Sequence, residues 1–315
     1  MDFVLSPYGG AGIEVPLLSP EIISLNTVEW PKYSKRSSFV DADGNLDITR
    51  SENHIASFIQ TWLYFGLLSA LGDTIINGRD FSTTGRNCSA IIDSELVVSA
   101  LVDNRFSLLR LPKSDRRLLL QRHATLLVEA SKASQWLESH FIEDSSELLE
   151  LIFLSVRILM GTIVRSYEYV PNWDMEENHE VVETWYCIIR RQSNTLGIAK
   201  RALRTKMIDN GWCVHQAHKI LSKFDYQTSY FFARLPRLNK ARVRHDQCTK
   251  KSCKGWDSKP GATRACHETE DCTCSTISVS SREVAKIIEN NRIPLVSIEE
   301  DNSGQLVIKL HTMKR

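Results

Sequence analysis

Residues 148–164 read LLELIFLSVRILMGTIV and form the longest apolar stretch of the chain. Within it, only Glu150 and Arg157 carry a charge. Its length is at the short limit of a transmembrane helix, which needs roughly 17–25 residues. Each of the two charges would cost about 2.5–3.5 kcal/mol at the centre of a bilayer. The stretch therefore predicts a buried core helix rather than a membrane span.

Helical periodicity continues on both sides of this stretch. Apolar residues recur at spacings of three and four after Asn53, which can cap a helix, and again after Pro112, where Ser114 is the expected cap. Gly211 is expected at the C′ position that ends a helix. No sustained alternation of period two occurs within residues 56–235, so we predict a multi-helix bundle. The predicted helices cover residues 53–71, 90–102, 114–136, 144–167, 181–191, 196–208, 213–224 and 226–235.

The two ends of the chain differ from this helical region. Residues 1–52 are broken repeatedly by proline and glycine and are predicted to form an extended arm. Near the C-terminus, Ser280 and Glu283 form a capping box for a short helix, and strand-like runs at 293–298 and 305–310 flank the turn sequence EEDNSG. The sequence thus predicts a mainly α protein in three parts: an arm (1–52), a helical domain (53–235) and a small α+β module with a β-hairpin (236–315).

The overall composition is that of an ordinary globular protein. The chain has 315 residues, with 42% hydrophobic and 24% charged residues and a net charge of +1. No global field therefore attracts nucleic acid or an acidic membrane. The N-terminus lacks the basic and apolar regions of a signal peptide, which predicts an intracellular, cytoplasmic protein without a membrane anchor. In a reducing compartment, clustered cysteines more often hold a metal than form disulfides.

Such a cluster lies near the C-terminus, where His245 to Cys274 follow the pattern H-x2-C-x4-C-x13-H-x4-C-x-C. Thiolate sulfur and imidazole nitrogen are the ligands that zinc takes in tetrahedral sites. The surrounding segment is polar and has little apolar area to bury, so a metal could supply its folding energy. The pattern predicts that one or two structural Zn²⁺ ions stabilise the α+β module (236–315). The ligands of first rank are Cys248, Cys253, His267, Cys272 and Cys274.

Two further residues are additional candidate ligands. His245 begins the pattern, although it could also be a solvated histidine in a basic loop. Cys213 could reach the cluster across the fold, or it could be a small buried residue near a helix start, because free cysteine is among the most buried residue types. Three other cysteines (Cys88, Cys187 and Cys266) and the helical pair His215 and His218 are interpreted as residues without a metal-binding role.

Catalysis and nucleic-acid binding are the alternatives to a structural role. A catalytic zinc would need an open coordination position and a nearby acid or base. The carboxylates at 268–271 are interpreted as a solvated loop. A zinc hydrolase is therefore a minor possibility, and we predict that the protein is not an enzyme.

The segment 234–254 has eight Lys or Arg residues against Asp246 alone. Because four aromatic residues at 226–232 precede it, this stretch could grip nucleic acid. Their helical spacing favours packing instead.

Several segments resemble a known family when they are taken in order. These are FIQTWLYFGLLS (58–69), GWC (211–213), LPRLNKARVRHDQCTKKSC (235–253), HETEDCTC (267–274) and Ile293-Pro294-Leu295. Together they are similar to the region that precedes the HET domain in fungal heterokaryon-incompatibility proteins.

The resemblance implies a role in self/non-self recognition and programmed cell death through protein–protein contacts, with a protein partner or a downstream effector domain. It does not extend to the HET domain itself, because the Ser-x-x-Trp signature of that domain is missing after residue 295. We therefore expect either an N-terminal fragment or a chain that has only the leading module. The predicted function is a non-catalytic scaffold or regulatory module, and a zinc-containing nucleic-acid binder that uses residues 234–254 is the alternative.

Overall fold

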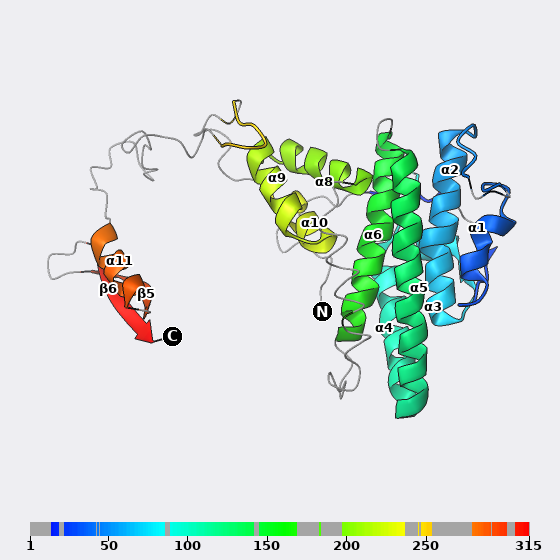
Figure 1. Ribbon diagram of the computed structural model, residues 1–315, viewed down its shortest axis with the longest axis horizontal. Coiled ribbons are helices and arrows are strands. Elements are labelled where there is room, and N and C mark those ends of the chain that lie inside the picture. Colours follow the sequence, from blue (N-terminus) through cyan, green and yellow to red (C-terminus); the bar gives the residue numbers. More distant parts are fainter. Residues whose placement is uncertain are drawn as a thin grey trace. The chain divides into compact units, whose positions relative to one another are not determined.

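The chain folds into two compact units, Met1–Trp256 and Asp257–Arg315. The computed structural model describes residues 14–18, 22–41, 43, 45–85, 89–141, 145–168, 183, 197–236, 245, 247–253, 279–290, 292–300 and 306–314. The predicted boundary at 235/236 falls inside the first unit, because the described residues between 245 and 253 pack with helices of that unit. Each unit is considered separately below (Figure 1).

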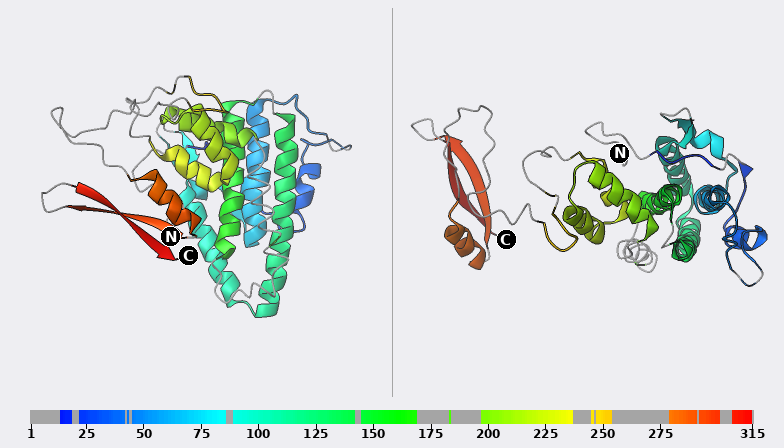
Figure 2. Two further views of the ribbon diagram at one scale, coloured as in Figure 1. Left: turned by 60° about the vertical axis from the view of Figure 1, so that its left-hand side comes forward. Right: turned by 90° about the horizontal axis from the view of Figure 1, so that it is seen from above.

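Long helices that stand side by side form the centre of the first unit (Figures 1 and 2). One of them runs without a break through α2 (Glu52–Ile59), the π-helical segment η2 (Gln60–Phe65) and α3 (Gly66–Gly72). The others are α4 (Ser94–Arg110), α5 (Lys113–His140) and α6 (Glu147–Glu168). Helix α6 contains the apolar stretch 148–164 and packs against α2, α4 and α5.

The prediction of a buried core helix at 148–164 is confirmed. Ile152, Phe153 and Val156 are fully buried on α6. Arg157 is also buried and forms an ion pair with Glu138 of α5, with 2.6 Å between Nη2 and the carboxylate. The helix Glu52–Gly72 is long and apolar enough to span a membrane by composition, but 89% of its apolar window is buried in the protein. It is packed as a core helix as well.

The N-terminal segment contains more structure than an extended arm. It includes strand β1 (Ile22–Ile23), the short helix η1 (Trp30–Lys32) and helix α1 (Tyr33–Arg36). The Trp30 side chain is 1% exposed, and its Nε1 donates a hydrogen bond of 2.8 Å to the Trp62 carbonyl oxygen. This segment is therefore part of the core, because Trp30 and Trp62 pack together at 5.5 Å between ring centroids.

The region between α3 and α4 corrects the prediction of a purely helical domain. It consists of β2 (Ile76–Asn77), the helical turn η3 (Gly78–Phe81), β3 (Ser82–Thr84) and β4 (Ala90–Ile92). A helix was predicted to begin at Ala90, but the helix α4 begins after Asp93, whose side chain accepts from the Glu95 N–H. Residues 90–92 are a strand because they pair with β3 and with the N-terminal residues Pro16 and Leu17.

Three shorter helices complete the first unit. They are α8 (Ile198–Asp209), α9 (Val214–Lys223) and α10 (Tyr226–Arg234), and both α8 and α10 pack against α6. The predictions of helices at 196–208, 213–224 and 226–235 are thus confirmed. Of the helix predicted at 181–191, the structure describes only Glu183, which is helical.

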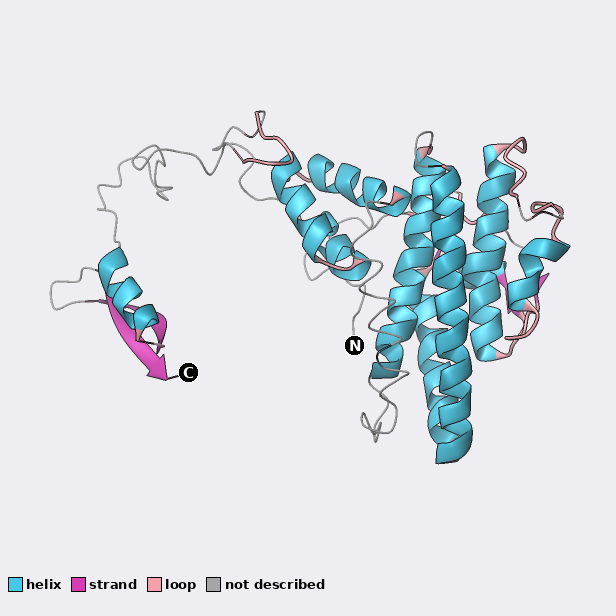
Figure 3. Ribbon diagram, viewed as in Figure 1, coloured by secondary structure: helices cyan, strands magenta, loops and turns pink. Residues whose placement is uncertain are grey.

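The second unit contains a helix and a β-hairpin, as predicted. Helix α11 (Ser281–Glu289) begins after Ser280, whose hydroxyl accepts from the Glu283 N–H. Strands β5 (Arg292–Glu300) and β6 (Leu306–Lys314) pair antiparallel, with Ile298 opposite Ile308. The described residues therefore form a mainly α protein with small hairpins (Figure 3).

Candidate metal centre

Cys213 occupies a position that the turn between α8 and α9 fixes. Gly211 follows α8 with φ of 89°, a conformation that glycine adopts without a steric penalty. The Gly211 N–H donates to the Ile208 carbonyl at 2.9 Å, and the Trp212 N–H donates to the Met207 carbonyl at 3.0 Å. These two bonds form a Schellman motif, which confirms Gly211 as the predicted C′ residue. The chain then turns directly into Cys213.

Contacts from α10 hold the same turn from the other side. The Trp212 Nε1 donates to the Leu235 carbonyl at 2.9 Å, and the Trp212 ring meets Phe232 edge to face at 6.0 Å. Cys213 is itself the N-cap of α9: its sulfur accepts from the Gln216 backbone N–H, and the Gln216 side chain accepts from the Cys213 N–H. The sulfur position is thus defined by three helices.

The second part of the site is a tight loop that contains His245, Cys248 and Cys253. The Cys248 N–H donates to the His245 carbonyl at 3.1 Å. Within the following turn, the Thr249 hydroxyl accepts from the N–H groups of Lys251 at 3.3 Å and Ser252 at 3.2 Å. Because of this turn, the side chains of Cys248 and Cys253 return to the same place.

Four potential ligand atoms converge where this loop meets α9. The Sγ atom of Cys253 lies 3.7 Å from the Sγ of Cys213 and 3.7 Å from the Sγ of Cys248. The Nδ1 of His245 lies 3.3 Å from the Cys248 sulfur and 3.4 Å from the Cys253 sulfur. All four ligand atoms lie within 4.8 Å of one another.

These distances have the size that a tetrahedral site requires. Two sulfurs that each lie about 2.3 Å from a tetrahedral ion are about 3.8 Å apart, and a sulfur and a nitrogen ligand are about 3.6 Å apart. A disulfide would instead bring two sulfurs to about 2.05 Å. Among the described residues, none of the three cysteines forms a disulfide. Cys213 is 5% and Cys253 6% exposed, whereas His245 and Cys248 are half-buried.

His215 supports the loop without joining the cluster. Its Nδ1 lies 3.0 Å from the Lys250 carbonyl oxygen. Because a carbonyl oxygen only accepts, the hydrogen must be on Nδ1. His215 was interpreted as a residue of the helix surface, and in the structure it joins α9 to the backbone between Cys248 and Cys253.

The structure brings together four of the seven predicted ligands: Cys213, His245, Cys248 and Cys253. The other three (His267, Cys272 and Cys274) lie outside the described residues, as do Cys88, Cys187, Cys266 and the carboxylates at 268–271. The sequence ranked His245 and Cys213 behind the others. Two signals in the sequence pointed to these residues as ligands: the compact spacing H-x2-C-x4-C for His245, and the position at a helix start for Cys213.

The aromatic residues before the basic segment mostly pack inside the protein. Tyr226 is 1% exposed, and Phe232 contacts both Trp212 and Phe224. Only Phe231, at 43%, is substantially exposed among the four. This favours the packing interpretation that the helical spacing suggested.

The Cys₃His group could therefore hold a metal ion. No family model, no curated protein and no solved structure matches this chain. The chemistry of the donor atoms is consequently the main guide to function.

Proposed function

We propose that this protein is a non-catalytic helical scaffold that a structural Zn²⁺ ion stabilises. Cys213, His245, Cys248 and Cys253 are its ligands. The observation that supports this most is the set of four donor distances, which suits a tetrahedral ion. Three thiolates and one imidazole form a soft donor set that is typical of structural zinc sites. With all four positions taken by side chains, no position is open to water or substrate.

The ion would fasten the loop 245–253 to the start of α9. Within the described part of this loop, Cys253 is the only apolar side chain that is buried, so hydrophobic packing contributes little to its folding. Structural zinc sites in small peptides contribute about 10–16 kcal/mol of apparent binding free energy at neutral pH. A fraction of this is enough to order a short polar loop.

The resemblance to heterokaryon-incompatibility proteins fits this assignment. All four ligands come from two of the segments on which the resemblance rests, GWC (211–213) and 235–253. We infer that these segments form a metal-binding module like the one that the resemblance implies in heterokaryon-incompatibility proteins. Such a module would position or restrain an effector domain in self/non-self recognition. Exposed apolar side chains on the second unit, such as Val296 at 55% and Ile298 at 67%, support a role in protein–protein contacts.

Metal analysis of the full chain tests the proposal. Native mass spectrometry together with elemental analysis should detect zinc bound to the folded protein. We expect Cys213→Ser to lose one ion per chain and Cys187→Ser, the matched control, to lose none. A second ion that disappears in Cys272→Ser would belong to His267, Cys272 and Cys274. If Cys213→Ser keeps the metal content of the wild type, the proposed site is wrong.

Nucleic-acid binding is the second candidate function, and one observation favours it. Lys250 and Lys251 are exposed on the turn between Cys248 and Cys253. A salt titration with single-stranded and duplex DNA and RNA separates the two functions. Binding by these cations would weaken steeply with salt. The scaffold proposal expects no binding even at low salt.

A further inference from the structure

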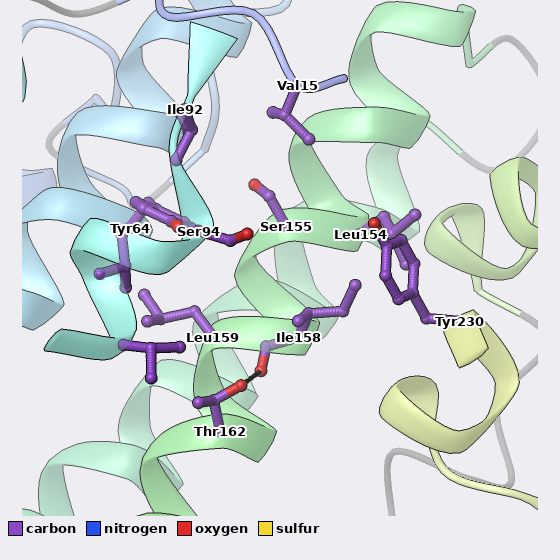
Figure 4. A pocket seen from close by; sticks show the side chains of 12 residues that line it. Val15, Tyr64, Ile92, Ser94, Leu154, Ser155, Ile158, Leu159, Thr162 and Tyr230 are labelled. Atoms are coloured by element: carbon purple, nitrogen blue, oxygen red, sulfur yellow. Dashed lines mark hydrogen bonds between the residues drawn. The ribbon is translucent and has the colours of Figure 1, made fainter. Parts of the chain in front are cut away.

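A pocket in the first unit, remote in sequence from the candidate ligands, has the features of a ligand site. Its volume is about 90 Å³. Helix α6 forms its floor with Ser155, Ile158 and Leu159, and the other walls come from η2, β4 and α4 (Figure 4). Val15 and Tyr230 complete the lining.

The lining is neutral. Most of its side chains are aliphatic, and the remaining ones carry hydroxyl groups; none is charged. A charged ligand would have to leave water without a counter-charge, which is costly. The lining therefore selects a neutral, largely apolar molecule.

Two of the five hydroxyl groups in the lining are engaged within their own helix, whereas that of Tyr64 is not. Ser155 and Thr162 donate to carbonyl oxygens of their own helix, at 2.7 Å to Ile152 and 2.9 Å to Ile158. Tyr64 is 5% exposed, and its hydroxyl has no hydrogen-bond partner among the described residues. Burial raises the pKa of Tyr64 well above its ordinary value, so the group stays a neutral donor.

Tyr64 lies in an unusual stretch of backbone. The segment Gln60–Phe65 is π-helical within an otherwise α-helical run. Such π-helical turns are rare and occur frequently at functional sites. Here the turn belongs to the pocket wall, and it places the Tyr64 side chain in the lining.

The rim of the pocket is held by specific hydrogen bonds. The Gln60 side chain accepts from the Leu18 N–H and donates to the Pro16 carbonyl, both at 2.8 Å. On the other side, the Ile92 N–H donates to the Val15 carbonyl at 2.9 Å. Val15 is thus fixed between η2 and β4. The pocket is a built feature of the fold rather than a packing defect.

We propose that this pocket binds a small neutral molecule with an apolar body and one hydrogen-bond acceptor, such as a carbonyl or ether oxygen, that faces the Tyr64 hydroxyl. An enclosed apolar cavity of about 150 Å³ accommodates benzene. A pocket of about 90 Å³ is smaller than this but open on one side, so it suits a short acyl chain or one part of a ring whose remainder reaches the mouth.

Two probes of equal heavy-atom number test the proposal: cyclohexanone, which carries an acceptor, and toluene, which does not. Methyl signals of Ile92 and Ile158 report on the pocket in NMR titrations, and those of Ile208 and Ile220 serve as remote references. We expect both probes to shift the pocket signals alone. Tyr64→Phe should weaken cyclohexanone binding about fivefold, the effect of one hydrogen bond, and leave toluene binding unchanged.

A pair of matched variants on α4 controls for indirect effects. Val98 lines the pocket, whereas Val102, one turn further, is 39% exposed and lies outside the lining. Val98→Phe should abolish the shifts by both probes, and Val102→Phe should leave them intact. The proposal is overturned if the folded wild type shows no shifts at Ile92 and Ile158 up to the solubility limit of both probes. It is equally overturned if Tyr64→Phe binds cyclohexanone as tightly as the wild type.

Discussion

The sulfur atoms of Cys213 and Cys253 lie 3.7 Å apart, although 40 positions separate the two residues in the chain. Cys213 caps a helix, and Cys253 ends a polar loop that is otherwise little buried. A third thiol and an imidazole converge on the same point, so the contact is part of a four-residue cluster that could hold a metal ion. In the proposed function, a metal ion held by this cluster would fasten the loop to the helix in a place where apolar packing is sparse.

Removal of the metal should therefore loosen the loop and leave the helical body folded. We expect a chelator to abolish the hydrogen-exchange protection of peptides that cover 247–253 and the start of α9, while peptides from α6 stay protected. The reason is that α6 is buried among other helices, whereas in the proposed function the loop is held by its metal ligands. Hydrogen-exchange mass spectrometry measures both regions at once. Unchanged protection of 247–253 after complete zinc removal would contradict the structural role.

The difference between local structure and long-range contacts explains what could be predicted from the sequence. The helix at 148–164 was predictable because its apolar residues are contiguous and its burial needs no knowledge of its partners. The C′ role of Gly211 was predictable because local backbone geometry alone requires it. Strand β4 was missed, since three residues become a strand only through pairing with β3 and the N-terminal segment.

The candidate site was predictable in part for a related reason. Cys248 and Cys253 stood out because they are close in sequence. Cys213 is joined to them only by the folding of α8, α9 and α10, which no spacing rule reports. The π-helical turn at Gln60–Phe65 gave no signal either, because all six of its residues are buried, and a helix that is buried on every side has no hydrophobic period that the turn would disturb.

The buried ion pair between Glu138 and Arg157 should be sensitive to the loss of one partner. The guanidinium donates to the carboxylate at 2.8 Å through Nε and 2.6 Å through Nη2, and both side chains are almost fully buried. Glu138→Gln leaves the Arg157 charge without its counter-charge, which should lower the free energy of unfolding by about 3 kcal/mol. Urea unfolding followed by circular dichroism measures the change.

An exposed ion pair on the same helix provides the control. Lys132 and Glu129 lie 2.8 Å apart at the surface. Glu129→Gln should cost less than about 1 kcal/mol, since solvent screens this pair. Equal effects of the two substitutions would show that burial does not decide the contribution of Glu138.

His123 should make the stability of the protein depend on pH. Its side chain is 1% exposed, and its Nδ1 lies 2.8 Å from the Tyr167 hydroxyl. Burial disfavours the imidazolium and lowers the pKa from 6.5 to about 4. Between these values the unfolded chain binds a proton that the folded chain does not. The free energy of unfolding should therefore fall as the pH decreases from 6.5 to 4, by up to about 3 kcal/mol from this group.

The variant His123→Leu isolates this contribution. Its absolute stability will differ from that of the wild type, but the part of the pH slope due to His123 should disappear. Denaturant unfolding at several pH values between 4 and 7 gives both slopes. Identical slopes for the two proteins would assign the pH dependence to other groups.

Gly211 should influence metal affinity although it is not a ligand. With φ at 89°, it adopts a left-handed conformation in the Schellman turn that leads into Cys213. An added Cβ in such a conformation costs about 1–2 kcal/mol, so Gly211→Ala should shift the turn and displace the Cys213 sulfur. Gly211→Asn is the matched control, because asparagine tolerates left-handed backbone better than alanine does. Competition with a zinc-binding dye should rank the affinities as wild type, then Gly211→Asn, then Gly211→Ala, with Cys213→Ser the weakest. An alanine variant that binds zinc as tightly as the wild type would mean that the turn does not position the ligand.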